Sequence, residues 1–339
     1  MATASFVVSS VGPLVSIQDQ GRSGLMRYGV PASGPMDRGA FEIANAALGN
    51  QPGATAIEIS MGGLALECIE GAVTVAVAGG GFLVSIDRTT HGSWIVATVR
   101  AGSRMIVRPG PWGSWTYLAF AGTLKAKSWL GGCSTQAASN LGGGRLTAGQ
   151  RLEVYDAEIW EERDGEIPCP VSSRPRTEIK VVLGPQERFV TQEALDLLFS
   201  RPFALTDAYD RMGVRLAGPS LRLNATLDMP SEAISRGSIQ VSGDGVATVL
   251  LSDHQTTGGY PKIATVVSSQ LDGLAQQRSR SQITFASIAP AAAIESVRMR
   301  RRRQEEYLAN LKAKPMTLAQ RLMAANLIDG VVSGAGFNR

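Results

Sequence analysis

The densest group of polar side chains in the sequence is DHQTTGGYPKIATV, residues 253–266. Adjacent glycines, Gly258 and Gly259, let a backbone approach a ligand closely, and Lys262 adds a cation. A P-loop requires G-x-x-x-x-G-K-[ST] at the start of a helix, whereas a strand-like Ile-Ala-Thr-Val-Val follows Lys262. The segment is therefore either a ligand-lining loop or a hairpin connection whose polar groups satisfy turn backbone. Its candidate binding residues are Gln255, Thr256, Thr257, Gly258, Gly259 and Tyr260.

Carboxylates that could move protons occur at other points of the chain. Asp37 directly precedes a helical pattern, so it is either a site carboxylate or the N-cap of that helix. Asp210 is followed at once by Arg211, and Glu232 precedes a predicted strand, although an exposed glutamate is more often a solvated surface group. A further polar cluster near the N-terminus contains Gln18, Asp19 and Arg22.

Several common chemistries lack their sequence patterns. The two histidines, His91 and His254, have no second ligand at zinc spacing, so we expect no metal site. No G-x-S-x-G motif is present, and Cys133 has no cationic neighbour in the sequence to activate it. The glycines at 79–81 precede an apolar run and not a helix, which argues against a dinucleotide-binding fold.

Composition and charge limit the class of protein. The net charge of +4 arises from 33 Lys and Arg against 29 Asp and Glu, and the run 298–303 supplies five arginines, so no broad basic surface is expected. Three widely spaced cysteines fit a reducing compartment. No apolar run reaches the roughly 18 residues of a membrane span. We expect a cytoplasmic protein without nucleic-acid or membrane partners.

Short β-branched runs between glycine turns predict a mainly β fold. The pattern predicts few helices, at 38–48 with Asp37 as N-cap and at 192–199 with Thr191 as N-cap. The predicted strands are 72–78, 94–99, 104–107, 180–183, 247–251, 263–267 and 282–286.

The two halves of the chain resemble each other at a shift near 174 residues. Gly12-Pro13 matches Gly184-Pro185, Asp37-Arg38 matches Asp210-Arg211, Ile59 to Gly62 matches Ile234 to Gly237, and Thr74-Val75 matches Thr248-Val249. These dipeptides are common, so chance is the alternative. We predict a first barrel over 1–165, a charged and Pro/Ser-rich linker, a second barrel over 177–290 and a helical tail over 291–339.

The tail differs in character from the barrels. Residues 294–311 combine the arginine run with Glu305 and Glu306 at spacings that allow i,i+4 pairs on a solvated helix. We expect this helix to pack on the barrels or on a partner and prefer this to a nucleic-acid arm. Pro315 should end it, and Thr317 could cap a shorter amphipathic helix.

Four ordered segments give the sequence a resemblance to a known family. They are GPLVSIQDQGRSGLMRYGVPASGPMD, LGPQERF, DRMGVRLAGP and SEAISRGSIQVSGDGVATVLLSDHQTTGGYPKIATV. The chain resembles the carboxyltransferase-domain family, which contains the C subunits of 5-oxoprolinases, the KipA-like proteins and the corresponding region of urea amidolyase and urea carboxylase. The resemblance implies two tandem cyclophilin-like β-barrels and a KipI-like partner, which is the B-type chain of an oxoprolinase. An oxoprolinase would also need a LamB/YcsF-like chain of the A type.

The resemblance also implies one of three roles. The first, which we favour, is the C subunit of a 5-oxoprolinase, which opens 5-oxoproline to glutamate with ATP. The second is a biotin-dependent carboxyltransferase for urea or a related amide; the chain has no Met-Lys-Met site, so biotin would arrive on another protein. The third is a non-catalytic regulator that binds a kinase inhibitor of the KipI type.

Amide activation needs donors for an oxyanion and a carboxylate for protons. Lys262, Arg211 and the Gly258 and Gly259 amides could serve the first role, and Asp37, Asp210 or Glu232 the second. The sequence departs from the family pattern at His254, where arginine is more usual, and at 278–285, which lacks a Pro-Gly-Asp turn. Residues that match the family's motifs are Gln18, Asp19, Gly21, Arg22, Gly34, Met36, Asp37, Asp210, Arg211, Met212, Gly213, Glu232, Gln255, Thr256, Thr257, Gly258, Gly259, Tyr260 and Lys262.

Overall fold

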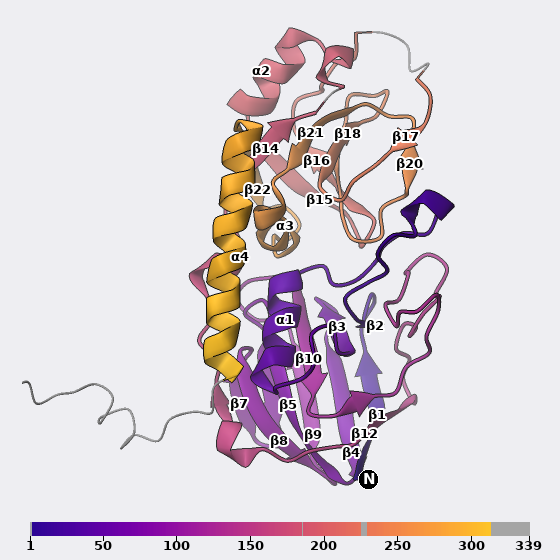
Figure 1. Cartoon of the computed structure of the whole chain (residues 1–339), viewed down its shortest axis with the longest axis vertical. Coiled ribbons are helices and arrows are strands. Elements are labelled where there is room, and N and C mark those ends of the chain that lie inside the picture. Colours follow the sequence, from indigo (N-terminus) through magenta and orange to yellow (C-terminus); the bar gives the residue numbers. More distant parts are fainter. Residues whose placement is uncertain (1, 185, 225–228, 313–339) are drawn as a thin grey trace, which may run out of the picture.

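The first part of the chain folds into two antiparallel sheets (Figure 1). The computed structural model describes residues 2–184, 186–224 and 229–312. One sheet has the strand order β11-β12-β1-β4-β9-β6-β7, and the other has β13-β8-β5-β10-β3-β2. The strands of the first sheet are β1 (Thr3–Val11), β4 (Leu64–Glu70), β6 (Leu83–Ile86), β7 (Thr89–Gly92), β9 (Arg104–Arg108), β11 (Thr123–Leu124) and β12 (Arg151–Tyr155). Those of the second are β2 (Ser16–Gln18), β3 (Ala56–Ser60), β5 (Ala72–Ala78), β8 (Ile95–Arg100), β10 (Trp115–Phe120) and β13 (Gly165–Glu166).

The first core lies between these sheets and helix α1 (Arg38–Ala47). Strand β5 is buried along almost its whole length because the other sheet covers one face and α1 the other, so it reads as a continuous apolar run. The Asp37 carboxylate accepts a hydrogen bond from the Ala40 amide at 2.9 Å and caps α1. The rings of Phe41 and Tyr117 then join α1 to β10, with centroids 5.8 Å apart.

The second part of the chain is a closed barrel with the order β14-β21-β18-β19-β16-β15-β22. Its buried interior includes Phe203 and Phe285, whose rings are 5.7 Å apart. A separate pair, β17 (Glu232–Ala233) and β20 (Thr257–Gly258), lies at its edge. The barrel strands are β14 (Glu178–Leu183), β15 (Phe203–Tyr209), β16 (Gly213–Ala217), β18 (Ser238–Val241), β19 (Ala247–Leu250), β21 (Lys262–Val266) and β22 (Gln282–Ser287).

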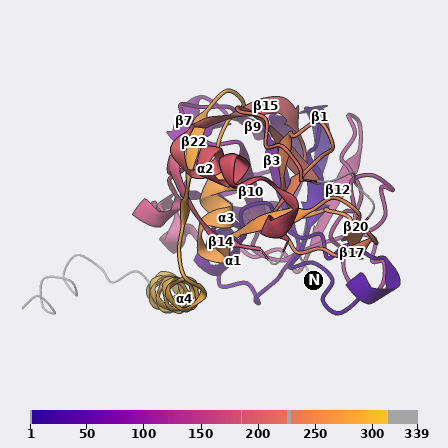
Figure 2. The same cartoon turned by 90° about the horizontal axis from the view of Figure 1, so that it is seen from above.

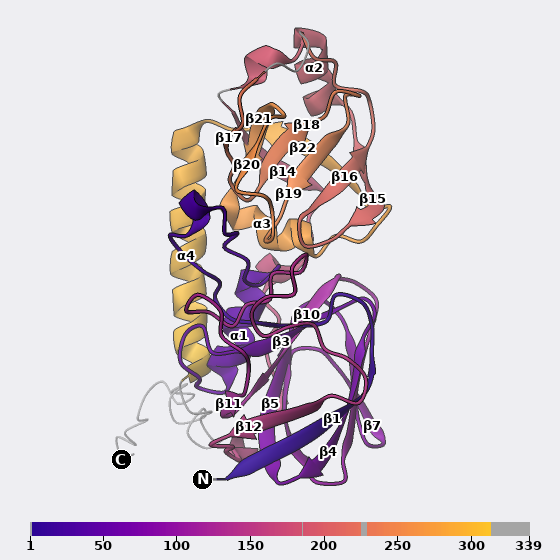
Figure 3. The same cartoon turned by 90° about the vertical axis from the view of Figure 1, so that its right-hand side faces the viewer.

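Helices connect and cover the two parts. Helix α2 (Gln192–Ser200) lies on the second barrel, and α3 (Ser268–Ala275) lies between the two parts (Figures 1 and 3). Helix α4 (Pro290–Lys312) runs along the side of both, and Figure 2 shows it at the periphery of the molecule. Within the described ranges, no helix combines the length and hydrophobicity needed to cross a membrane. Short 3-10 helices span Met26–Tyr28, Glu161–Arg163, Val171–Ser173 and Glu187–Phe189.

The predicted mainly β fold with few helices and a C-terminal helix is confirmed. The second barrel is closed, whereas the first part is built from two sheets. The N-caps Asp37 and Thr191 are both confirmed. Helix α3 was not predicted, because it contains Gly273 and has no capping side chain. The tail helix is longer than the predicted 294–311 and packs on α1 and α3, and the predicted helix at Thr317 lies outside the described residues.

The internal repeat is matched in part by the structure. Gly12 follows β1 and Gly184 follows β14, the first strand of each part. Asp37, however, caps α1, whereas Asp210 lies in the turn between β15 and β16, so this pair has different structural settings. The predicted boundaries at 165, 177 and 290 stay predictions; β13 ends at Glu166, and α4 starts at Pro290.

Candidate functional site

Five polar side chains meet at one end of the second barrel, and we call them the Lys262 cluster: Gln186, Glu232, Gln240, Gln255 and Lys262. Lys262 lies directly opposite Gln240 in the β18–β21 pair, which puts both side chains on the same face of the sheet. The Lys262 Nζ is 3.2 Å from Glu232 Oε2, and Gln186 Nε2 donates to the same oxygen at 2.6 Å. Gln186 Oε1 also accepts from the Lys262 amide at 2.8 Å, so one glutamine positions both partners of the ion pair.

The loop predicted to line a site closes over this cluster. Pairing of Glu232 with Gly258 in β17–β20 fixes the loop, and Gln255 Nε2 donates to Gln240 Oε1 at 3.1 Å. A side chain on Gly258 would meet Ile234 Cδ1 at 2.7 Å and Gln240 Nε2 at 2.9 Å, so an added methyl group would displace the ends of these two side chains. Gly259 is not crowded, because its nearest neighbours would be 3.6 Å away or more.

An open cavity of about 830 Å³ adjoins the Lys262 cluster. Gln240 and Gln255 belong to both, and Asp210 and Tyr260 add a carboxylate and an exposed ring to the cavity wall. The Asp210 carboxylate accepts from the Met212 amide at 2.7 Å, which stabilises the turn between β15 and β16. The volume lies in the range of small-molecule sites. Amide, carboxylate and phenol groups in such a wall suit a small polar ligand.

The electrostatics of the cluster are asymmetric. The Lys262 side chain is 9% exposed, whereas Glu232 is 50% exposed. A cation held in a largely desolvated position acts more strongly on a neighbouring oxygen than one in water. The half-exposed carboxylate is accessible to solvent and to a ligand. The structure therefore pairs these two residues, while the roles predicted for them, an oxygen-binding cation and a proton acceptor, stay predictions.

Arg211 lies in a second group, a buried network between the two parts of the chain. Its guanidinium donates to Asp253 Oδ2 at 3.1 Å and Oδ1 at 3.0 Å, to Gly34 O at 2.6 Å, and to Glu58 Oε1. All three charged side chains are buried. Burial lowers the pKa of Arg211, but the carboxylates of Asp253 and Glu58 outweigh this effect and raise the pKa overall. With no exposed surface, Arg211 is placed to join the two parts, and its predicted catalytic role stays a prediction.

The network continues through Tyr117 to Asp37. Glu58 Oε2 accepts from the Tyr117 hydroxyl at 2.8 Å, and this hydroxyl accepts from the Asp37 amide at 2.7 Å. Gln276, from the second part, donates to Asp37 Oδ2 at 2.7 Å. Burial and then the Asp272 carboxylate raise the pKa of Asp37 to about 7. Asp37 is therefore a helix cap at the interface between the parts, with a proton affinity far above that of an exposed aspartate.

The N-terminal cluster organises a loop of the first part. Asp19 accepts from the amides of Cys133 at 2.5 Å and Ser134 at 3.1 Å, and Arg22 donates to the Ser134 carbonyl at 2.6 Å. Gln18 donates to the Thr135 carbonyl at 3.3 Å. The three predicted binding residues therefore hold residues 132–135 in place. They belong to the first part of the chain, whereas the Lys262 cluster belongs to the second, and a direct ligand contact by them stays a prediction.

His254 lies between the buried network and the Lys262 cluster. Its side chain is buried, and Nδ1 is 2.7 Å from the Gln255 carbonyl. Burial lowers the pKa of His254, and nearby Arg236 lowers it further. The lowered pKa favours the neutral form of this histidine. Of the remaining predicted residues, the Thr256 carbonyl accepts from the Ile234 amide at 3.1 Å, and the Thr257 side chain is exposed.

The structure thus divides the predicted residues among separate locations. Glu232, Gln255, Gly258 and Lys262 come together, with Asp210 and Tyr260 beside them, while Asp37 and Arg211 lie in the buried network. Sequence reasoning missed Glu58, although an acid inside the apolar run Ala56–Ser60 is a detectable signal of a buried partner. It also missed Gln186, Gln240 and Tyr117, which carry no local signal because their partners are distant in the sequence.

The fold and the ordered motifs define the class of this protein. It belongs to the carboxyltransferase domain family, whose subdomains A and B match residues 28–287. The chain is 33% identical to the C subunit of 5-oxoprolinase from Haemophilus influenzae, over 88% of this chain and 94% of that protein. It is 30% identical to the C subunit of 5-oxoprolinase from Escherichia coli, over 88% of this chain and 95% of that protein.

A solved relative shares the architecture. The structure superimposes on the urea carboxylase of Kluyveromyces lactis with a TM-score of 0.81 and 25% identity. The match covers 94% of this chain but 30% of that enzyme. This chain therefore corresponds to one segment of the larger enzyme. The predicted family resemblance is confirmed.

Proposed function

We propose that this chain is the C subunit of a 5-oxoprolinase, which hydrolyses 5-oxoproline to glutamate with ATP together with A-type and B-type partner chains. The observation that carries the proposal is the extent of the match to two 5-oxoprolinase C subunits. It covers 94% and 95% of their length, whereas the urea carboxylase match covers 30% of that enzyme. The partners we expect are a KipI-like chain of the B type and a LamB/YcsF-like chain of the A type.

In this proposal the Lys262 cluster and its adjoining cavity bind the cyclic amide. Lys262 Nζ donates to the substrate's oxygen as negative charge develops on it, and Gln186 and Glu232 hold that cation in position. Glu232, which is half exposed, accepts a proton during ring opening. The cluster supplies a single cation, which suits a carbonyl or carboxylate better than a triphosphate. We therefore propose that partner chains complete the ATP site.

The test is an assay of 5-oxoproline-dependent ATP hydrolysis by this chain, purified with its KipI-like partner, with and without the LamB/YcsF-like chain. Lys262→Ala should lower kcat/KM at least a hundredfold, because an oxyanion donor of this kind contributes about 10²–10³ in rate. The matched control is Lys125→Ala, which also removes a lysine–glutamate pair but on the exposed surface of the first part. Equal activity of the two variants would exclude Lys262 from the reaction.

A second function is favoured by the 0.81 TM-score to the urea carboxylase. In that case the same cavity would bind a linear amide and accept a carboxyl group from biotin carried on another protein. Biotin-dependent carboxylation in the reconstituted complex, with ATP turnover at background when 5-oxoproline is added, would replace the first proposal by this one. If Lys262→Ala keeps partner binding and no amide is turned over by the wild type, a regulatory role of the KipA-like kind is supported instead.

A further inference from the structure

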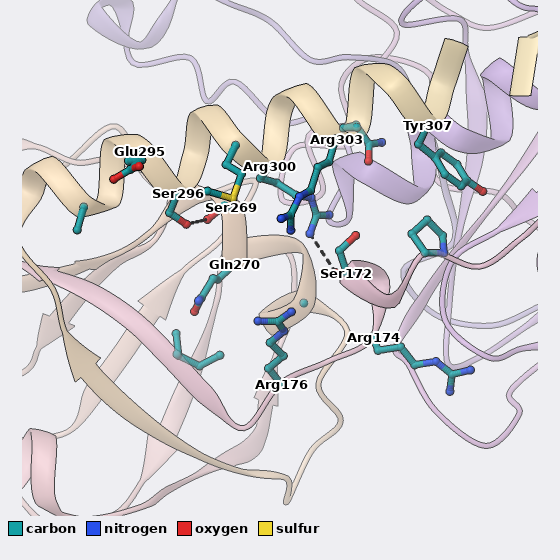
Figure 4. A pocket seen from close by; sticks show the side chains of 16 residues that line it. Ser172, Arg174, Arg176, Ser269, Gln270, Glu295, Ser296, Arg300, Arg303 and Tyr307 are labelled. Atoms are coloured by element: carbon teal, nitrogen blue, oxygen red, sulfur yellow. Dashed lines mark hydrogen bonds between the residues drawn. The ribbon is translucent and has the colours of Figure 1, made fainter. Parts of the chain in front are cut away.

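A second cavity, of about 590 Å³, lies between helix α4, helix α3 and the segment that joins the two parts of the chain. It shares no lining residue with the Lys262 cluster. Figure 4 shows Arg300 and Arg303 reaching into it from α4, while Arg176 approaches from the opposite wall. Three serine hydroxyls, of Ser172, Ser269 and Ser296, line the same space.

The wall of this cavity carries an excess of positive charge. Arg174, Arg176, Arg300 and Arg303 line it, and among the described residues Glu295 is the one acid in the lining. Nearby Asp272 lies 3.9 Å from Arg300 Nη2, and Arg300 Nη1 also donates to the Ser172 carbonyl at 3.1 Å.

Three of these arginines lack a compensating carboxylate. Within residues 2–184, 186–224 and 229–312, no ion pair involves Arg174, Arg176 or Arg303. Arg174 is held differently, with its guanidinium carbon 4.8 Å from the centroid of the Trp112 ring. Like charges gathered around one cavity repel each other, and an anion between them relieves that repulsion.

We propose that this cavity binds a small phosphate-bearing molecule. Guanidinium groups on opposite walls match the several oxygens of a phosphate, because each group offers a planar pair of donors. The serine hydroxyls can donate to the remaining oxygens. Apolar atoms of Ile179, Met299 and Tyr307 provide a surface for the rest of the ligand. The volume is that of a small-molecule site and not that of a single ion.

Binding here would also tie the two parts of the chain together. Arg300 and Arg303 belong to α4, which packs on α1 of the first part and α3 of the second, and Arg176 belongs to the connecting segment. A phosphate held between these walls strengthens the attachment of α4. This inference does not depend on the proposed function, since the cavity and the Lys262 cluster have no residue in common.

The experiment is calorimetric titration of the full chain with pyrophosphate, inorganic phosphate, ATP and, as a carboxylate probe, glutamate, at a fixed salt concentration near 0.15 M. The double variant Arg176→Gln/Arg303→Gln should weaken pyrophosphate binding at least tenfold. The control Arg298→Gln/Arg302→Gln removes the same number of charges from positions on α4 outside the cavity, and it should change pyrophosphate binding less than twofold.

Tighter binding of ATP than of pyrophosphate would identify a nucleotide as the source of the phosphate, and equal binding would identify the phosphate group alone. Lys262→Ala should leave the affinities for ATP and for pyrophosphate unchanged, because Lys262 does not line this cavity. If pyrophosphate binding weakened equally in the two arginine double variants, the proposal would be overturned in favour of a non-specific attraction to the positive charge of the chain. Absence of binding by the wild-type chain, or glutamate binding as tight as pyrophosphate binding, would also overturn it.

Discussion

Replacing Arg211 by methionine tests whether the buried network holds the two parts of the chain together. Methionine is long, unbranched and apolar, so it fills much of the same space without charge. The replacement removes the hydrogen bonds to Asp253, Glu58 and the Gly34 carbonyl. It leaves two carboxylates, both buried, without their shared cation.

The expected loss follows from these contacts. Removing one partner of a buried ion pair costs about 3–5 kcal/mol, because the other charge stays desolvated. Here one cation is paired with two carboxylates, so we expect the loss of stability to lie at the upper end of this range. In the variant, Glu58 still accepts hydrogen bonds from the Tyr117 hydroxyl and the Met36 amide, and Asp253 still accepts one from the Ala137 amide at 2.8 Å. These remaining hydrogen bonds limit the loss of stability. We expect the free energy of unfolding to fall by about 4–5 kcal/mol.

The measurement is urea unfolding followed by circular dichroism, with proteolysis at the junction of the two parts as a local probe. Native stabilities are about 5–15 kcal/mol, so Arg211→Met is expected near the limit of folding. Arg211→Lys keeps the charge without the two-pronged geometry and should lose about 2 kcal/mol. The matched control is Arg215→Met, which removes an exposed pair with Asp244 and should cost less than about 1 kcal/mol.

A double-mutant cycle separates the ion pair from the effects of side-chain shape. Asp253→Asn removes one of the stranded charges, so its addition to Arg211→Met should cost less than it does in the wild type, with a coupling of at least about 1 kcal/mol. The reasoning would be refuted if Arg211→Met cost no more than Arg215→Met. It would also be refuted if the effects of Arg211→Met and Asp253→Asn were additive.

Two further predictions concern the loop and the buried carboxyl. Gly258→Ala should cost about 1 kcal/mol, the lower end for overpacking, and lower activity, because its methyl group displaces the ends of the Ile234 and Gln240 side chains. Gly259→Ala should change neither stability nor activity, and equal urea midpoints for the two variants would contradict this prediction. Since the pKa of Asp37 is raised from 3.8 to about 7, the free energy of unfolding should fall as pH rises from about 4 to 7. Asp37→Asn should flatten this slope in urea titrations at pH 5 and 8, and an unchanged slope would argue against the assignment.

Local patterns predicted the elements well because they depend on neighbouring residues. The run at 72–78 matches β5 residue for residue, and Asp37 and Thr191 cap the helices that follow them. The strand pattern after Lys262 also excluded a P-loop, and Lys262–Val266 is strand β21. Helix α3 was missed because its segment has no capping side chain and contains Gly273.

The sequence by itself determined the β-rich elements, the helix caps and the family of this protein, since each is encoded in short segments. Only the tertiary structure decided which polar residues share a location. Arg211 and Glu58 are 153 residues apart in the chain, and the hydrogen bond between Lys262 and Gln186 joins residues that are 76 apart. Such contacts depend on strand register and on the packing of two separate cores. That is why Lys262 and Glu232 form one site, while Arg211, equally prominent in the motifs, lies buried between the two parts.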